Sequence, residues 1–189
     1  LIHKFKSQNI FEIGTWIGSS TMTMAEAVRN NDSGHIYTCD TSNQCVLSDS
    51  YSDIVTTYNK HSDTALDQIP KDITFDFIFA DGELTFKTIK KIKRQLDSEA
   101  IIVTHDFVQP AEKGVLNLVR MQLSSQFSYS YVLPKDSINT NYEGTIIGIL
   151  LPQQIYEQSL SKRILFTFYL AIIAFVVRSY YKIINTTKK

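Results

Sequence analysis

The sequence has few cysteines, glycines and prolines, and each shortage excludes a class of protein. Its two cysteines, Cys39 and Cys45, are too few for a disulfide framework or for a zinc site with four cysteine ligands. Seven glycines and four prolines exclude a fibrous chain. Charged residues make up 20% of the chain and hydrophobic residues 43%, which excludes intrinsic disorder and a polytopic membrane protein. The 189 residues are enough for one domain with a sizeable core.

Charge is distributed unevenly along the chain, although the formal net charge is zero. Residues 1–150 contain 13 Lys or Arg against 18 Asp or Glu, a net charge of −5. Residues 151–189 contain six basic residues and one acid, Glu157, a net charge of +5. Because nucleic-acid binding depends on cationic contacts with phosphate, the acidic main part predicts no nucleic-acid partner.

Short apolar runs alternate with helix-length segments, a pattern typical of a parallel sheet with helices on its faces. Cys39 falls within one of the apolar runs, so we expect its thiol to be buried. Ser19, Ser20 and Thr21 precede the first long helix and are typical N-cap residues. The expected strands are residues 9–14, 35–40, an edge strand late in 48–60, 75–81, 100–104, and an antiparallel pair at 127–133 and 145–150. The expected helices are residues 21–30, a short helix early in 48–60, one or two turns at 64–69, 84–96 and 112–123.

Two glycines separate the first expected strand from the helix that follows it, in the segment FEIGTWIGSST at residues 11–21. Glycine lets the backbone approach a ligand without a Cβ in the way, and a helix N-terminus offers free N–H donors. A tight turn would also account for Gly14 and Gly18. The second strand ends at Asp40, 26 residues after the first glycine, where an acid can accept hydrogen bonds from both ribose hydroxyls. Together these features favour a ligand that contains adenosine.

The glycine spacing G-x-x-x-G differs from the dinucleotide fingerprint G-x-G-x-x-G, and Glu12 precedes it by two residues. A carboxylate gives nothing to a pyrophosphate but suits the cation of S-adenosylmethionine. In the form E-h-G-x-x-x-G-x-S-T, where h is apolar, residues 11–21 resemble the first motif of class I S-adenosylmethionine-dependent methyltransferases. The resemblance continues through Asp40, FDFIFADG at residues 75–82 and IIVTHDF at residues 101–107. It covers residues 9–150 in order.

The resemblance implies an S-adenosylmethionine site above the loop that follows the first strand. Asp40 would hold the ribose, and Asp81 at the end of the fourth strand would face the reaction centre. The adenine would be lined by Ser62 and Asp63. The loop beneath the methionine part of the cofactor would consist of Glu12, Gly14, Thr15, Gly18 and Ser19. Trp16, within this loop, either covers the cofactor or packs on the sheet.

His105 and Asp106, at the end of the fifth strand, are the candidate catalytic residues. Methyl transfer to oxygen needs alignment and removal of a proton, and histidine titrates near neutrality, which suits a general base. The alternative for His105 is a hydrogen-bonded residue at the sheet rim. Asp106 would orient the imidazole or bind a cation. Asp81 and Asp106 end neighbouring strands and would hold Mg²⁺, which polarises a substrate hydroxyl in related O-methyltransferases.

Two departures from the family pattern keep a second hypothesis open. Relatives commonly have Asp-His after the glycine of the fourth strand, where this sequence has Glu83 and Leu84. The usual Gly-Gly turn before the fifth strand is replaced by residues 97–99, Asp-Ser-Glu. The alternative to an enzyme is therefore a catalytically inactive methyltransferase-fold protein that acts as a membrane-tethered binding module.

Residues 164–177 form an apolar run with one threonine, flanked on both sides by basic residues. Extended to residue 184, the segment would be a helix of about 31 Å, close to the ~30 Å of a bilayer core, if Arg178 and Lys182 reach the interface. A hydrophobic helix packed on the domain or on a partner is the alternative. We expect a C-terminal membrane anchor, and hence a membrane-associated protein with its catalytic domain in the cytoplasm.

The sequence therefore predicts an S-adenosylmethionine-dependent methyltransferase-like domain at residues 1–152 and a hydrophobic helix at residues 160–185. The fold class is α/β, a Rossmann-like three-layer sandwich with a mostly parallel seven-stranded sheet and a terminal antiparallel hairpin. The predicted reaction is O-methylation of a small or membrane-proximal substrate. Its cofactor would be S-adenosylmethionine, with Mg²⁺ as a second candidate.

Overall fold

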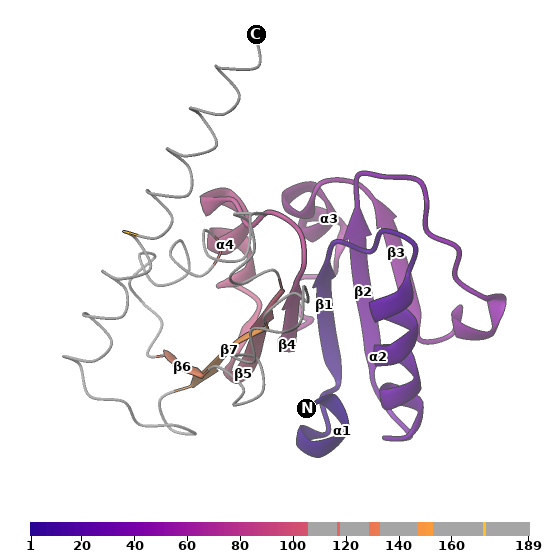
Figure 1. The fold of residues 1–189 in the computed structure, drawn as a ribbon, viewed down its shortest axis with the longest axis horizontal. Helices are drawn as coiled ribbons and strands as arrows, with labels where there is room; N and C mark the ends of the chain where they lie inside the picture. Colours follow the sequence, from indigo (N-terminus) through magenta and orange to yellow (C-terminus); the bar gives the residue numbers. More distant parts are fainter. Residues whose placement is uncertain (106–116, 118–128, 133–146, 153–171, 173–189) are drawn as a thin grey trace, which may run out of the picture.

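The computed structural model describes residues 1–105, 117, 129–132, 147–152 and 172 (Figure 1). Its helices are α1 (Ile2–Phe5), α2 (Ser19–Arg29), the 3-10 helix η1 (Asp49–Tyr51), α3 (Ser62–Gln68) and α4 (Phe86–Ile92). Its strands are β1 (Asn9–Ile13), β2 (His35–Asp40), β3 (Val55–Asn59), β4 (Phe75–Ala80), β5 (Leu96–Thr104), β6 (Tyr129–Val132) and β7 (Gly148–Pro152).

Side chains along the central strands alternate between two apolar layers, because successive residues of a strand point to opposite faces of the sheet. In β1, Phe11 and Ile13 belong to one core cluster and Ile10 to the other. Residues of α3 and α4 complete the first cluster, and residues of α1 and α2 complete the second. The sheet is therefore the middle layer of a three-layer α/β sandwich (Figure 1).

The sheet is mostly parallel, and its strand order creates a crossover beside β1. The described strands follow the order β3-β2-β1-β4-β5-β7-β6. The pairs among β1 to β5 are parallel, whereas β7 pairs antiparallel with both β5 and β6. The predicted mostly parallel sheet with a terminal antiparallel pair is confirmed. Since the chain builds β2 and β3 on one side of β1 and then crosses to β4 on the other, the loops diverge at the carboxyl ends of β1 and β4.

The helix predicted at residues 84–96 is shorter than expected at both ends. It begins after Thr85, whose hydroxyl accepts a hydrogen bond from the Thr88 N–H at 3.1 Å, and it ends at Ile92. Leu96 fits the helical spacing of Ile89 and Ile92, but it begins β5 and pairs with Phe75 of β4. Pairing with β4 therefore places Leu96 in a strand, although the apolar spacing had assigned it to the helix.

The predicted N-cap of α2 is wrong. Gly18 occupies the N-cap position, and no side chain caps the helix. The hydroxyls of Ser20 and Thr21 donate instead to the carboxylate of Glu12, which is buried within the sheet. A buried carboxylate is costly without hydrogen-bond donors, so these hydroxyls bond to Glu12 instead of capping the helix N-terminus.

The predictions for the C-terminal part fall mostly outside the described residues. This applies to the helix at 112–123, apart from Asn117, and to the segment at 160–185, apart from Ile172. In the part of the chain that the structure describes, no helix combines the length and the apolar character needed to cross a bilayer. The membrane anchor therefore stays a prediction.

Candidate functional site

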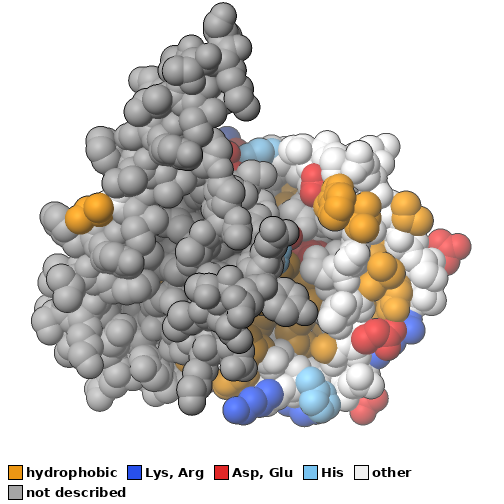
Figure 2. Space-filling view, in the orientation of Figure 1, with side chains coloured by type: hydrophobic (Ala, Val, Ile, Leu, Met, Phe, Trp, Pro, Cys, Tyr) orange, Lys and Arg blue, Asp and Glu red, His pale blue; other side chains and the backbone are white. Residues whose placement is uncertain are grey.

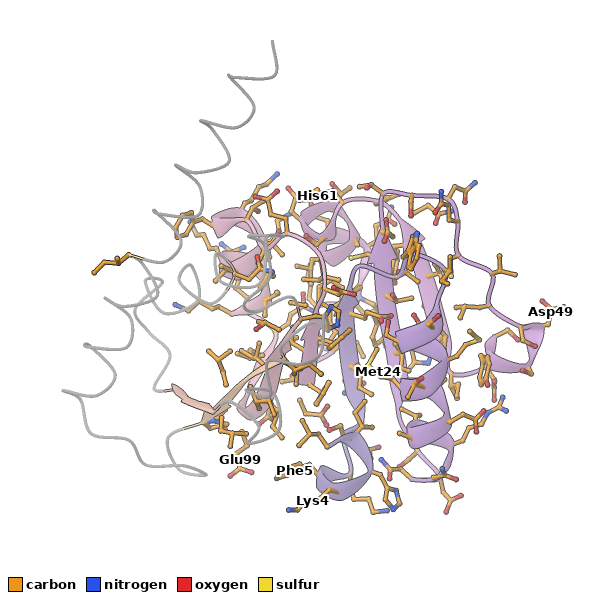
Figure 3. All side chains as sticks on the ribbon, viewed as in Figure 1. Lys4, Phe5, Met24, Asp49, His61 and Glu99 are labelled. Atoms are coloured by element: carbon orange, nitrogen blue, oxygen red, sulfur yellow. The ribbon has the colours of Figure 1, made fainter. Side chains whose placement is uncertain are left out.

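The carboxyl ends of β1 to β4 surround a cavity of about 590 Å³. It lies at the crossover beside β1, where open parallel sheets bind ligands, and its size is typical of a small-molecule site. In Figure 3, His61 lies at the same end of the molecule, at the start of α3. The lining residues are Ile13, Gly14, Trp16, Cys39, Asp40, Thr41, Ser42, Gln44, Lys60, His61, Ser62, Asp81, Gly82 and Glu83.

Gly14 has a positive φ of +98°, a conformation that favours glycine. A Cβ at this position would lie 2.9 Å from the Gly82 nitrogen and 3.0 Å from the Asp81 carbonyl carbon. Glycine is therefore required because the loop after β1 touches the backbone of the turn after β4. This contact, rather than a close approach to a ligand, explains the glycine, although Gly14 also lines the cavity.

Asp40 ends β2 at the cavity and is held by two backbone donors. Its Oδ2 accepts a hydrogen bond from the Trp16 N–H at 2.8 Å, and its Oδ1 accepts one from the Ser42 N–H at 2.7 Å. Partial burial acts to raise the pKa of the Asp40 carboxyl, but the hydrogen bonds from Ser42 and Trp16 outweigh it, so the pKa is lowered. The carboxylate is therefore ionised at neutral pH, and each oxygen can accept a further hydrogen bond.

Glu12 is fully buried and is not among the residues that line the cavity. Its carboxylate accepts hydrogen bonds from the hydroxyls of Ser20, Thr21 and Thr38 at 2.5 to 2.6 Å. The Thr38 hydroxyl also pairs with that of Thr15 at 2.5 Å. Burial raises the pKa of the Glu12 carboxyl, and the three hydroxyl donors offset only part of that effect. Glu12 thus ties β1, β2 and the start of α2 together behind the loop.

Of the five loop residues predicted beneath the methionine part, Gly14 alone lines the cavity. Glu12 and Thr15 are buried in the hydroxyl network. Gly18 has a φ of +92°, and a Cβ there would lie 2.9 Å from Leu47 Cδ2. Ser19 is exposed at the start of α2.

The start of α3 brings Ser62 to the cavity but directs Asp63 elsewhere. Ser62 is buried, and its hydroxyl pairs with that of Thr88 at 3.0 Å. The Asp63 carboxylate accepts hydrogen bonds from Lys87 Nζ at 2.6 Å and from His61 Nδ1 at 2.8 Å. The Lys87 hydrogen bond, helped by His61, holds the pKa of Asp63 well below its usual range. His61, rather than Asp63, therefore lines the cavity beside Ser62.

Asp81 and His105 meet at the carboxyl ends of the neighbouring strands β4 and β5. His105 Nδ1 lies 2.8 Å from Asp81 Oδ1, and both side chains are about one-quarter to one-third exposed, 26% and 32%. Since an ionised carboxylate can only accept, Nδ1 is the donor in this hydrogen bond. Asp81 lines the cavity. Asp106, predicted as the partner of His105, lies outside the described residues.

The predicted Mg²⁺ site is only partly covered by the structure. Asp81 offers carboxylate oxygens, which are the ligand type that Mg²⁺ prefers. The second predicted ligand is Asp106, outside the described ranges. Among the residues that are described, no three His, Cys, Asp or Glu side chains lie close enough to hold a metal ion.

Trp16 is exposed at the cavity rim, so the alternative that it packs on the sheet is wrong. Its side chain is 60% exposed, and its indole N–H donates to Gln44 Oε1 at 2.9 Å. Ile17 and Val46 are exposed as well. Figure 2 shows apolar side chains gathered on the surface of the described part of the molecule. Lys60 and Gln44 line the cavity, but nothing in their local sequence indicated that they would.

Leu84, which stands where relatives commonly have histidine, is completely buried in the core cluster of α3 and α4. Its backbone N–H donates to Oδ1 of Asn117 at 2.7 Å. Sequence reasoning did not single out Asn117, because an isolated asparagine in an expected helix carries no local signal.

Comparison with known proteins identifies the domain. The family described as a methyltransferase domain matches residues 11–107, which are 97 of the 189 residues. No curated protein matches the chain.

Solved methyltransferase structures share the fold at low sequence identity. The methyltransferase PaMTH1 from Podospora anserina, solved with bound S-adenosylhomocysteine (SAH), has a TM-score of 0.57 and 16% identity, over 80% of this chain and 74% of that one. The O-methyltransferase from Bacillus cereus in complex with SAH has a TM-score of 0.55 and 19% identity, over 79% and 76%. TomG, an O-methyltransferase of tomaymycin synthesis from Streptomyces achromogenes solved with SAM, has a TM-score of 0.55 and 16% identity, over 80% and 76%.

Proposed function

This chain belongs to the methyltransferase domain family of class I S-adenosylmethionine-dependent enzymes, and we propose that it methylates an oxygen of a small or membrane-proximal acceptor. The observation that carries the proposal is that Gly14, Asp40 and Asp81, from three neighbouring strand ends, line one cavity of about 590 Å³. S-adenosylmethionine (SAM) would occupy this cavity. The SAM and SAH in solved neighbours of the same fold support this choice of cofactor.

Asp40 would bind the ribose of the cofactor. Its two backbone donors fix the carboxylate and lower its pKa. The remaining lone pairs would accept hydrogen bonds from the two ribose hydroxyls. His61 and Ser62 would border the adenine, with Asp63 holding the imidazole of His61 by its 2.8 Å hydrogen bond. Gly14 would lie beneath the methionine part, with the buried Glu12 and Thr15 supporting the loop from behind.

His105 would act as the proton acceptor. The sulfonium of SAM supplies an electrophilic methyl group, so the protein needs to align the acceptor and take its proton. His105 Nε2 would accept the hydroxyl proton while Asp81 holds Nδ1–H. The new O–CH₃ bond forms as the S–CH₃ bond breaks, and the bonding electrons return to sulfur to leave S-adenosylhomocysteine (SAH).

Magnesium is a separate proposal for the same end of the sheet. Asp81 and Asp106 would hold the ion, which would polarise the acceptor hydroxyl. The carboxylate type of both side chains supports this proposal, and Asp106 would otherwise act beside His105.

The binding step is tested by titrating the protein with SAH and following the fluorescence of Trp16, the single tryptophan, at the cavity rim. Replacing Asp40 by asparagine should weaken SAH binding by at least about tenfold, or ~1.4 kcal/mol. Asp76→Asn is the matched control, because Asp76 also accepts two backbone N–H groups, from Gln8 and Asn9, but at the amino end of β4. No SAH binding by the wild-type protein, or equal loss in both variants, would refute the proposal.

A non-catalytic binding module is the second candidate, and the buried Leu84 at the position of the family's histidine favours it. Both candidates predict SAH binding, but the enzyme alone transfers a labelled methyl group from SAM to a small-molecule acceptor. Loss of that transfer in His105→Gln, with SAH affinity retained, would identify the enzyme.

Membrane association through residues 164–184, with the domain in the cytoplasm, is a further part of the proposed function. The apolar run and its basic flanks support it. Fused to a soluble reporter, residues 160–189 should carry the reporter to membranes. A reporter that stays in the soluble fraction would contradict the anchor.

A further inference from the structure

The turn after β4 carries three residues that line the cavity, Asp81, Gly82 and Glu83. On the β1 side its backbone is held by a single carbonyl. The N–H groups of Asp81 and Gly82 both donate to the Ile13 oxygen, at 2.8 Å each. This arrangement fixes the first half of the turn against β1 and leaves the Gly82 carbonyl and the Leu84 N–H to be paired elsewhere.

Asn117 pairs both of these groups from the other side. Its Oδ1 accepts a hydrogen bond from the Leu84 N–H at 2.7 Å, and its Nδ2 donates to the Gly82 oxygen at 2.7 Å. The side chain is fully buried. A carboxamide offers a donor and an acceptor side by side, so it can satisfy an N–H and a C=O of one turn together.

We propose that Asn117 is a positioning residue of the cofactor site, because it sets the turn that directs Asp81 and Glu83 into the cavity. This inference rests on the proposed function. The turn also touches the loop after β1, since a Cβ at Gly14 would lie only 2.9 Å from the Gly82 nitrogen. A displacement of Gly82 is therefore transmitted to Gly14 on the adjoining wall, and the hydrogen bonds of Asn117 act on two neighbouring walls of the site.

Gln95 provides a matched control within the same domain. Its buried carboxamide also clamps two backbone groups, donating to the Pro70 oxygen at 2.9 Å and to the Ile73 oxygen at 3.1 Å. Gln95 precedes β5 and thus lies at the amino ends of the strands, whereas the cavity lies at their carboxyl ends. Gln95→Ala and Asn117→Ala therefore remove similar buried clamps at opposite ends of the sheet.

The test compares SAH affinity, read from Trp16 fluorescence, with thermal unfolding for Asn117→Ala, Asn117→Asp and Gln95→Ala. All three variants should unfold at lower temperature than the wild-type protein, because each leaves buried backbone groups unpaired. Only the Asn117 variants should bind SAH more weakly, by at least about tenfold, since small misplacements at a site cost this much or more. Asn117→Asp keeps the acceptor for Leu84 but loses the donor to Gly82, so it isolates one half of the clamp.

The outcomes separate this inference from the proposed function. If wild-type protein does not bind SAH, the proposed function fails. If wild-type binds but the Asn117 variants match Gln95→Ala in affinity, Asn117 is structural and the inference fails. Failure of both Asn117 variants to fold would overturn it as well, because the residue would then be required by the domain as a whole rather than by the site.

Discussion

Replacing Gly14 by alanine is expected to damage both stability and cofactor binding. An alanine at a φ of +98° costs about 1–2 kcal/mol in backbone strain. Its Cβ would also lie 2.9 Å and 3.0 Å from backbone atoms of Gly82 and Asp81, an overlap that costs about 1–3 kcal/mol because backbone cannot swing away as a side chain can. The free energy of unfolding should therefore fall by about 2–5 kcal/mol, with about 2–4 °C lost from Tm for each kcal/mol.

The overlap must be relieved by moving the turn after β4, so SAH affinity should fall by at least about tenfold. Gly34→Ala is the control. Gly34 has a φ of +124°, and a Cβ there would lie 3.1 Å from the Gln8 oxygen, but Gly34 precedes β2, at the amino ends of the strands and away from the cavity. Urea unfolding should show a loss of stability in both variants, and Trp16 titration a loss of binding in Gly14→Ala alone. Wild-type affinity in Gly14→Ala, or equal weakening in Gly34→Ala, would refute the reasoning.

Three further changes probe the rest of the site. Burial raises the pKa of the Glu12 carboxyl above its ordinary value of 4.5, so the folded state holds this proton more tightly than the unfolded state. The free energy of unfolding of the wild-type protein should therefore fall as the pH rises from 4.5 through the raised pKa, and urea titrations should show a smaller fall in Glu12→Gln. If Asp81 and Asp106 hold Mg²⁺, excess EDTA should abolish methyl transfer; full activity in EDTA would exclude the metal. Lys87→Ala should leave the urea midpoint close to that of the wild-type protein, because the lysine is largely exposed and solvent screens its ion pair with Asp63; a large fall of the midpoint would contradict this. A wild-type SAH affinity in this variant would show that the pair does not shape the site.

The strands around the site could be predicted because their residue pattern admits few alternatives. The runs at β1, β2 and β4 are short, apolar and rich in β-branched or aromatic residues, and the structure places each within one residue of its predicted bounds. The carboxyl ends of parallel strands meet at one edge of a sheet. Gly14, Asp40 and Asp81 were therefore brought together by topology alone.

The partners of individual side chains could not be predicted, because they depend on tertiary contacts. The sequence predicted Asp106, the next residue, as the partner of His105. The structure instead gives His105 a hydrogen bond with Asp81, 24 residues earlier. Asp63 turns to Lys87 on another helix, which leaves His61 at the cavity. Asn117 reaches a turn more than 30 residues away.

The hydroxyls before α2 illustrate the same limit for local motifs. Ser20 and Thr21 have the residue types of an N-cap, but their geometry is set by a buried acid on β1. Burial of Glu12 is a property of the folded sheet, and a carboxylate without donors there would cost several kcal/mol, of the order expected for unpaired buried charge. A short-range pattern cannot reveal a requirement of that kind.

The two thiols of the domain differ in accessibility. Cys39 is 1% exposed, its thiol donates to the Glu12 carbonyl, and burial raises its pKa, so it should resist alkylating reagents. Burial raises the pKa of Cys45 too, but its side chain is only half-buried, in the segment that packs against Gly18. A maleimide dye should therefore attach at a single position beside the cofactor loop, and the native chain already contains a labelling site for fluorescence studies without any engineered cysteine.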